Sequence, residues 1–424
     1  MRRGRSVLLL LLLSLLQAAS GVARSADWPQ WRGPTRDGHV GADEPAVQAL
    51  PRERKPLWTV SIGGGHSSPV VAEGGLLFLD EDGRREVAHL LEAGTGREQW
   101  RTPFADRLED EWGAGPRSTP LIDGDRAYVQ SCSGEFRCLN LADGGVLWSL
   151  SFEKDYGVKF LGARGPETAV AARRGNNGSA VADGDAVIVP VGSTNGASLV
   201  CCDMRTGRVL WTAGREEAAY SSPVVAPLAG VRQVVYLSAD SLMGFERASG
   251  RLLWRQPLRT FARRHAATPV VFGNRVVVNS HTFGMVCFEI ARRADGLAAV
   301  EVWRNPDLRV NLATPVFVEG HLYSQGPARD YLCVEATRGE VKWSRTGFGQ
   351  GRRDYASTLV LGENLLVLTE DGTLVLLAAD PERYRELGRL QVSGNTWSHP
   401  AYANGRLYVR DGRQLSCLDL GAGP

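Results

Sequence analysis

Cysteine thiols are the most reactive side chains in this 424-residue sequence, and two of its seven cysteines, Cys201 and Cys202, are adjacent. Thiols can form disulfides, bind metals or act as nucleophiles. The adjacent pair lies in Val-Cys-Cys-Asp-Met, a run typical of a β-strand, where successive side chains point to opposite faces. Five cysteines recur at one position of a repeated phrase: Cys138, Cys201, Cys287, Cys333 and Cys417. We therefore predict that the cysteines are small core hydrophobes without disulfides.

Carboxylates also occur at spacings that suit metal binding. Asp-Gly-Asp is found at residues 123–125 and 183–185. Both copies stand where other repeats have an Asn-Gly or Glu-Gly hairpin turn, and one turn supplies too few oxygen ligands for Ca²⁺. The motifs Gly-x-Ser-x-Gly, His-Glu-x-x-His and Gly-x-Gly-x-x-Gly are absent from the sequence. We therefore predict no catalytic residue and no metal site.

A repeated phrase that ends in tryptophan indicates which elements carry these residues. Seven tryptophans occupy its last place, and in five of the phrases a glycine stands four residues earlier. The five pairs are Gly96/Trp100, Gly144/Trp148, Gly207/Trp211, Gly250/Trp254 and Gly339/Trp343, while Trp58 and Trp303 lack the glycine. A signature that returns about every forty residues is typical of a repeat fold.

Each repeat begins with a short phrase such as Ser-Ser-Pro or Ala-Thr-Pro, which opens an apolar run. Turns rich in Gly, Asn and Asp separate it from three further short runs, the pattern of antiparallel strands. Four strands per repeat without helical periodicity predict a propeller blade. The eight repeats begin near Ser67, Ser118, Ser179, Ser221, Ala267, Ala313, Ser357 and His399.

The eighth repeat is one strand short, because the chain stops after Cys-Leu-Asp-Leu from Cys417. We expect the run Lys-Pro-Leu-Trp-Thr-Val around Trp58 to supply the missing strand, since this pairing removes two exposed sheet edges. The sequence thus predicts an all-β, eight-bladed propeller over residues 55–420, closed by an N-terminal strand. A composition of 43% hydrophobic residues with 49 Gly and 21 Pro agrees with that fold class.

The first strand of a blade lines the central channel, so the residue just before it stands at the channel mouth. Reading one such position per blade gives His66, Arg117, Asn177, Tyr220, Ala266, Leu312, Tyr355 and Trp397. All of them except Ala266 and Leu312 carry polar or aromatic groups, and we predict that these six bind a small ligand or a peptide. The alternative is that they fill the channel neck and bond to loop carbonyls.

Two segments lie outside the repeat pattern. The insert Ser149–Gly178 is the longest between blades, and long loops on rigid scaffolds often carry recognition. We expect the insert to line the channel mouth; the alternative is that it is a disordered loop on the surface. Residues 24–54 are rich in Trp and Pro and therefore extended. We expect Trp28 and Trp31 to pack on the outer surface as a clasp, or to bind a partner.

The N-terminus resembles a secretion signal. Arg2, Arg3 and Arg5 precede the apolar run Val7–Leu16, and cleavage is expected near Ala23, so residues 1–23 form the predicted signal peptide. Its removal leaves 46 basic against 47 acidic residues. This balanced charge, without a basic block, predicts no binding to nucleic acid or to an anionic membrane. We expect a periplasmic or secreted monomer without a transmembrane segment or a lipid anchor.

The tryptophan repeats, together with Asp-Trp-Pro-Gln-Trp-Arg-Gly-Pro from Asp27, resemble the PQQ-like propeller family, which includes quinoprotein dehydrogenases and the assembly factor BamB. The resemblance covers nearly the whole mature chain. It implies the propeller fold, but not one function. For a quinoprotein member of this family, the resemblance also implies a bound PQQ. The PQQ is then held between a Trp and a disulfide of neighbouring cysteines, and Ca²⁺ is bound by Glu, Asn and Asp. Cys201 and Cys202 are the adjacent pair here, but they are expected inside a strand and not in a loop.

The sequence therefore predicts an exported, non-catalytic binding scaffold with a ligand site at the channel mouth and no cofactor. Two alternatives stay open. One is a PQQ- and Ca²⁺-dependent dehydrogenase, and the other is a BamB-like scaffold that captures unfolded outer-membrane strands by pairing at sheet edges.

Overall fold

The computed structural model describes residues 27–110, 112–158, 175–260, 263–349, 351 and 355–421. The predicted signal peptide and residues 159–174 of the insert lie outside these ranges. Among the described residues, no helix is both long and apolar enough to cross a bilayer.

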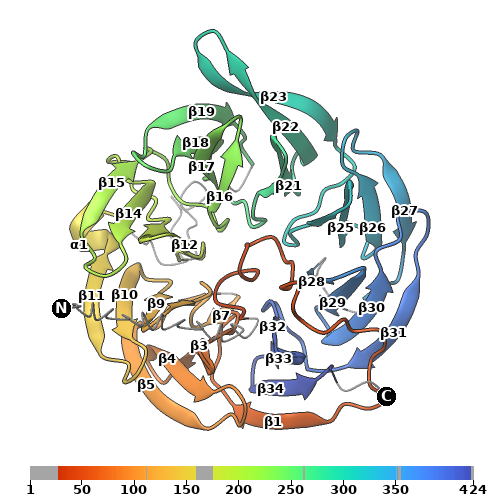
Figure 1. Ribbon diagram of the computed structural model, residues 1–424. Coiled ribbons are helices and arrows are strands. Elements are labelled where there is room, and N and C mark those ends of the chain that lie inside the picture. The colour runs from red at the N-terminus through yellow and green to blue at the C-terminus, as the bar shows by residue number, and fades with distance from the viewer. Residues whose placement is uncertain are drawn as a thin grey trace, which may run out of the picture.

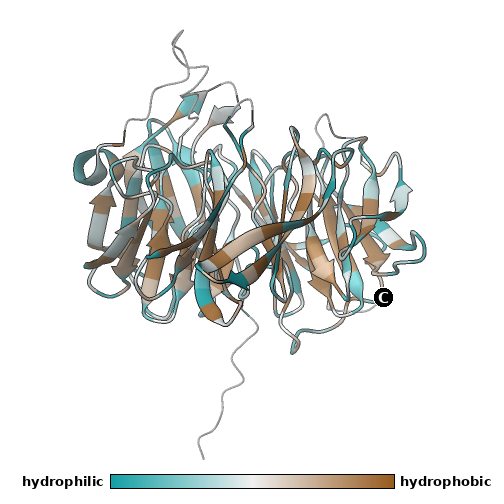
Figure 2. Ribbon diagram, turned by 90° about the horizontal axis from the view of Figure 1, so that it is seen from above, coloured by the Kyte–Doolittle hydropathy of each residue, from teal (hydrophilic) through white to brown (hydrophobic). Residues whose placement is uncertain are grey.

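Eight antiparallel four-stranded sheets surround a central channel, which confirms the eight-bladed propeller (Figure 1). Each sheet runs from an inner strand beside the channel to an outer strand at the rim. Seen from the side, hydrophobic residues concentrate in the strands, where neighbouring sheets pack face to face (Figure 2).

Blades one to four have the following bounds: β2 (Val70–Ala72), β3 (Gly75–Asp82), β4 (Arg85–Glu92), β5 (Glu98–Asp106); β8 (Leu121–Asp123), β9 (Arg126–Gln130), β10 (Glu135–Asn140), β11 (Val146–Ser151); β12 (Val181–Asp183), β13 (Ala186–Val189), β14 (Leu199–Asp203), β15 (Val209–Ala213); β16 (Val224–Leu228), β17 (Val231–Leu237), β18 (Ser241–Glu246), β19 (Leu252–Pro257). Blades five to eight have these: β20 (Val270–Phe272), β21 (Arg275–Ser280), β22 (Gly284–Arg293), β23 (Gly296–Asn305); β24 (Val316–Val318), β25 (His321–Gln325), β26 (Tyr331–Glu335), β27 (Val341–Arg345); β28 (Ala356–Leu361), β29 (Asn364–Thr369), β30 (Thr373–Ala378), β31 (Glu386–Gln391); β32 (Ala401–Ala403), β33 (Arg406–Arg410), β34 (Gln414–Asp419), β1 (Pro56–Ser61).

Two small elements lie between blades. The strands β6 (Glu109–Asp110) and β7 (Gly113–Ala114) pair as a hairpin between blades one and two. The helix α1 (Phe152–Tyr156) follows blade two and opens the described part of the insert. Its one buried side chain is Phe152.

The ring closes as predicted. Strand β1 pairs antiparallel with β34, and Trp58 stands opposite Cys417. The N-terminal strand thereby completes the sheet β32-β33-β34-β1. This pairing covers the edge that β34 would otherwise expose.

The repeated glycine and tryptophan join neighbouring blades. The indole of Trp148 lies over the glycine turn of the next blade, where a Cβ on Gly207 would stand 2.6 Å from Trp148 Cδ2. Gly207 also has φ +72°, a conformation that favours glycine. Trp148 Nε1 donates a hydrogen bond to Met204 O at 3.1 Å. Bonds of this kind to the next blade are also made by Trp58, Trp100, Trp211, Trp303 and Trp343.

The seven cysteines are free and buried, as predicted. Cys201 and Cys202 belong to different hydrophobic clusters on opposite faces of β14. Alternation along the strand separates their sulfur atoms.

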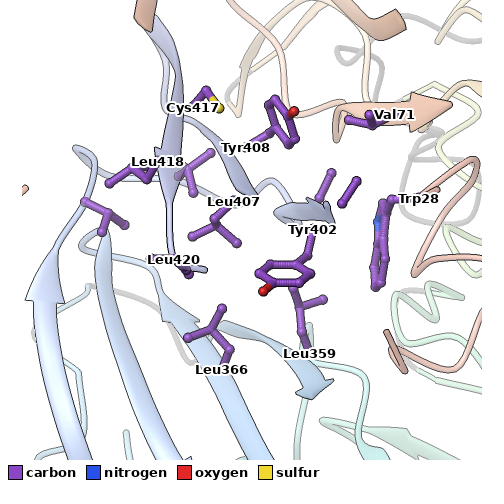
Figure 3. Packing of buried hydrophobic residues seen from close by; sticks show 14 of the residues in the cluster. Trp28, Val71, Leu359, Leu366, Tyr402, Leu407, Tyr408, Cys417, Leu418 and Leu420 are labelled. Atoms are coloured by element: carbon purple, nitrogen blue, oxygen red, sulfur yellow. The ribbon is translucent and has the colours of Figure 1, made fainter. Parts of the chain in front are cut away.

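The segment before β1 occupies the centre of the ring, so the expected outer-surface clasp is wrong. In Figure 1 this segment, coloured red, runs through the middle of the propeller. Trp28 is 2% exposed and forms a backbone bridge with Val71 of blade one. Figure 3 shows Trp28 alongside Tyr402 of blade eight. We call residues 28–47 the plug.

The plug is bonded to the inner ends of most blades. Arg36 donates to Ser179 O and Ala180 O of blade three at 3.1 and 2.8 Å, and Arg32 donates to Pro315 O of blade six at 2.8 Å. Further plug bonds reach Ile122, Thr268, Val360 and Gly405 in blades two, five, seven and eight. The two buried guanidinium groups thus donate to backbone carbonyls at the inner ends of blades three and six, and these bonds hold the plug in the ring.

The plug folds tightly because of its glycines and two strained arginines. Gly33 has φ +82°, and a Cβ there would stand 2.6 Å from Trp28 Cζ3. Arg32 and Arg36 have φ values of 59° and 60°, which are uncommon for residues with a side chain. The sequence Trp-Pro-Gln-Trp-Arg-Gly-Pro therefore encodes a compact turn that fits inside the ring.

Candidate functional site

All eight predicted mouth positions line one cavity at the end of the channel, with a volume of about 560 Å³. The structure thus brings together His66, Arg117, Asn177, Tyr220, Tyr355 and Trp397, with Ala266 and Leu312. A cavity of this size suits a small molecule. Eight further lining residues were not among the predicted mouth positions: Trp31, Trp112, Arg264, His281, Asn311, Thr314, Ala356 and His399.

An aromatic wall forms one side of the cavity. The rings of His66 and Trp397 lie 5.1 Å apart, and those of Trp112 and Trp397 lie 5.6 Å apart. Trp112 comes from the turn between β6 and β7, and its carbonyl is 3.0 Å from His66 Nε2. Trp397 Nε1 donates to Glu370 Oε1 at 3.0 Å, which fixes the plane of the indole. The wall therefore offers flat, preoriented faces for stacking.

Two arginines bring positive charge to the cavity. Arg117 stands before blade two and donates to Gly113 O at 3.2 Å, while Arg264 stands before blade five. No Asp or Glu is among the described residues that line the cavity. The nearby Glu86 is fully buried, and this burial raises its pKa to about 8, although N–H groups of Cys132 and Leu108 and the charge of Arg117 oppose the shift. Glu86 is therefore largely protonated at neutral pH and offsets little of the arginine charge.

The floor of the cavity is formed by the plug and by His399. The rings of Trp31 and His399 meet edge to face at 5.3 Å, and Trp31 Nε1 donates to Thr268 Oγ1 at 3.0 Å. His399 is 5% exposed, and burial together with the charge of Arg32 lowers its pKa to about 3. The imidazole is therefore neutral. Its Nδ1 has no hydrogen-bond partner among the described residues.

Several mouth residues are also bonded to the framework, as the alternative interpretation expects. Tyr355 is buried, its hydroxyl lies 3.3 Å from Ser357 Oγ, and burial raises its pKa to about 12. Asn177 Oδ1 accepts from Cys132 Sγ at 3.5 Å. These bonds fix the side chains in place, and such fixed groups favour ligand binding because less freedom is lost.

The described ends of the insert pack against blade three and the cavity. Ser193 Oγ donates to Tyr156 O at the end of α1. At the other end, Asn176 Nδ2 donates to Pro190 O at 2.7 Å, and the next residue, Asn177, lines the cavity. The predicted role of residues 159–174 at the mouth lies outside the described part of the chain.

The cavity does not match the metal and disulfide arrangement that quinoproteins use. Ca²⁺ requires six to eight oxygen ligands, but the lining lacks carboxylates over the described residues. No group of three His, Cys, Asp or Glu within the described ranges is placed to hold a metal. Cys201 and Cys202 are 0% exposed inside blade three and cannot form a platform over the cavity.

The fold and the site define a repeat propeller that gathers cationic and aromatic side chains at one channel mouth. A family model described as outer membrane protein assembly factor BamB matches residues 43–212 and 84–306. The chain belongs to this family of PQQ-like repeat propellers. No significant match was found among curated proteins.

Two solved structures share the fold at low sequence identity, and a third matches with a TM-score below 0.5. BamB from Moraxella catarrhalis is 15% identical with a TM-score of 0.53, over 86% of this chain and 96% of that chain. The computationally designed Ika8 protein is 12% identical with a TM-score of 0.59, over 86% and 99%. Quinohemoprotein alcohol dehydrogenase from Comamonas testosteroni is 13% identical with a TM-score of 0.49, over 96% and 82%.

Proposed function

We propose that this protein is an exported, non-catalytic propeller that binds a small anion with a flat apolar face in its mouth cavity. The observation that carries the proposal is the lining itself, where two arginines and an aromatic wall meet with no carboxylate among the described residues. A charge-assisted bond from Arg117 would hold an acidic group, and Trp397 would stack on the flat face. Export is proposed from the signal-like residues 1–23.

A binding experiment with aromatic carboxylates tests this function. We expect wild-type protein to bind 2-naphthoate in titration calorimetry and the double variant Arg117→Ala/Trp397→Ala to lose the binding. Because Trp397 also contacts Glu370 of blade seven and His66 before blade one, circular dichroism and a melting curve must show that the double variant keeps the fold. Arg205→Ala is a matched control, because Arg205 is exposed at the β14–β15 turn outside the cavity. Equal binding by wild type and the double variant would place the site elsewhere.

A second candidate is an assembly scaffold, the role in the name of the matching family. Apolar side chains are exposed on the outer strands of adjacent blades, with Val146 and Leu147 on β11 at 48% and 46% and Val209 and Leu210 on β15 at 40% and 39%. An extended partner strand could pair with such an edge and cover these side chains. Val209→Lys/Leu210→Lys should then weaken capture of a labelled, urea-unfolded outer-membrane barrel protein. Equal capture by this variant and wild type would rule out that edge.

A further inference from the structure

The plug carries a buried positive charge to the base of the mouth cavity. Arg32 follows Trp31, the plug residue in the cavity lining, and is only 1% exposed. Its Nη2 donates to Pro315 O at 2.8 Å, and the residue before Pro315, Thr314, lines the cavity. Its charge also acts on Tyr355 and His399 of the lining. The guanidinium group therefore lies close behind the cavity floor.

This charge is poorly compensated. Arg32 Nη2 donates to two carbonyls, Asp37 O at 2.9 Å and Pro315 O at 2.8 Å. Its Nε and Nη1 have no hydrogen-bond partner among the described residues. The carboxylate of Asp37 acts on Arg32 only through space, and it accepts hydrogen bonds from the Thr35 hydroxyl and the backbone N–H of His39. Burial lowers the pKa of Arg32 to about 10, so the group stays cationic at neutral pH.

A second plug arginine adds to the same potential. Arg36 is 3% exposed and donates to carbonyls of blade three. Burial, and to a smaller extent the charge of Arg32, lower the pKa of Arg36 to about 9. Two buried cations in one segment destabilise the folded state unless their charges are paired or solvated. An anion in the cavity above them would lower that cost.

We propose that Arg32, brought into the ring by the plug, is the residue that makes the mouth cavity select anions over neutral ligands of the same shape. The inference rests on the proposed function, and it adds a specificity-determining residue that need not touch the ligand. The plug is then part of the binding site as well as of the ring. A unit charge roughly 10 Å away, at an effective dielectric constant of about 20, changes affinity on the order of tenfold.

The test compares 2-naphthoate with its neutral analogue 2-naphthamide. In Arg32→Met we expect about tenfold weaker binding of the acid and an amide affinity within about twofold of wild type. Arg32→Lys keeps the charge and should retain most of the preference for the acid. Arg36→Met should lower the preference in the same direction, and it serves as the second neutral variant where Arg32→Met does not fold.

The outcomes separate this inference from the proposed function. An equal loss of acid and amide binding in the neutral variants would show a structural role and overturn the inference. An unchanged preference for the acid would also overturn it, while Arg117→Ala/Trp397→Ala could still abolish binding. If wild type binds neither compound, the proposed function is contradicted, and the inference fails with it because the cavity then has no anion to select.

Discussion

Replacing Gly207 with alanine tests how the repeated glycine and tryptophan hold the blades together. Gly207 has φ +72°, and an added Cβ would stand 2.6 Å from Cδ2 of Trp148 in the preceding blade. Gly184, in the same blade, has φ +62° but nothing within 4 Å of an added Cβ. The two substitutions therefore share the backbone strain and differ in the clash.

The expected magnitudes follow from those two terms. The left-handed backbone costs an alanine roughly 1–2 kcal/mol at either site. Displacing the packed indole adds about 1–3 kcal/mol at Gly207 alone. We thus expect Gly207→Ala to lower the free energy of unfolding by about 2–4 kcal/mol and Gly184→Ala by about 1–2 kcal/mol.

Urea unfolding followed by far-ultraviolet circular dichroism measures both effects. In a Trp148→Ala background the clash is absent, so Gly207→Ala should cost no more than Gly184→Ala. Equal effects of the two substitutions in the wild-type background would refute the interblade role of the glycine. So would an unchanged cost of Gly207→Ala after Trp148 is removed.

Three further predictions concern closure, pH and redox chemistry. Trp58→Ala should lower the free energy of unfolding by roughly 2–4 kcal/mol. Leu57 is 49% exposed, so Leu57→Ala should change it by less than about 0.5 kcal/mol. Equal melting temperatures of the two variants would refute closure by β1. Burial lowers the pKa of His89, but hydrogen bonds and charges from Asp80 and Glu98 outweigh burial and raise the pKa above its usual value. The protonated His89 therefore stabilises the fold fully below the unfolded pKa of about 6.5, and this stabilisation is lost as pH rises through the folded pKa. Wild type should therefore lose more stability than His89→Gln between pH 6 and 9, and parallel pH profiles would refute this. Protein supplied with PQQ and Ca²⁺ should not oxidise alcohols or sugars with an electron-accepting dye; turnover that stops on chelation and returns with Ca²⁺ would favour the dehydrogenase.

The sequence predicts the ring well because its signals are local and repeated. Five of the repeat tryptophans lie over a glycine turn that the next repeat supplies, namely Trp58, Trp100, Trp148, Trp211 and Trp303. The spacing of Gly207 and Trp211 therefore encodes both the blade and its contact. The mouth residues follow from the same register, because one position per repeat faces the channel. His66 and Trp397 therefore meet although they are far apart in the sequence.

The plug could not be predicted in the same way, because residues 27–54 have no counterpart in the repeats. Trp and Pro indicate an extended, buried segment but not the surface that receives it. The contacts of Arg32 and Arg36 with backbone carbonyls depend on a ring that forms elsewhere in the chain. Trp31 and Arg32 therefore stayed outside the predicted site.

A crystal structure with 6-bromo-2-naphthoate would test the central claim most directly, because bromine can be located by its anomalous scattering. We expect one strong bromine peak in the mouth cavity, with the carboxylate toward Arg117 and the ring against Trp397. The same peak should be absent from crystals of Arg117→Ala/Trp397→Ala. A cavity without bromine in crystals that carry the compound elsewhere would contradict the proposed binding site.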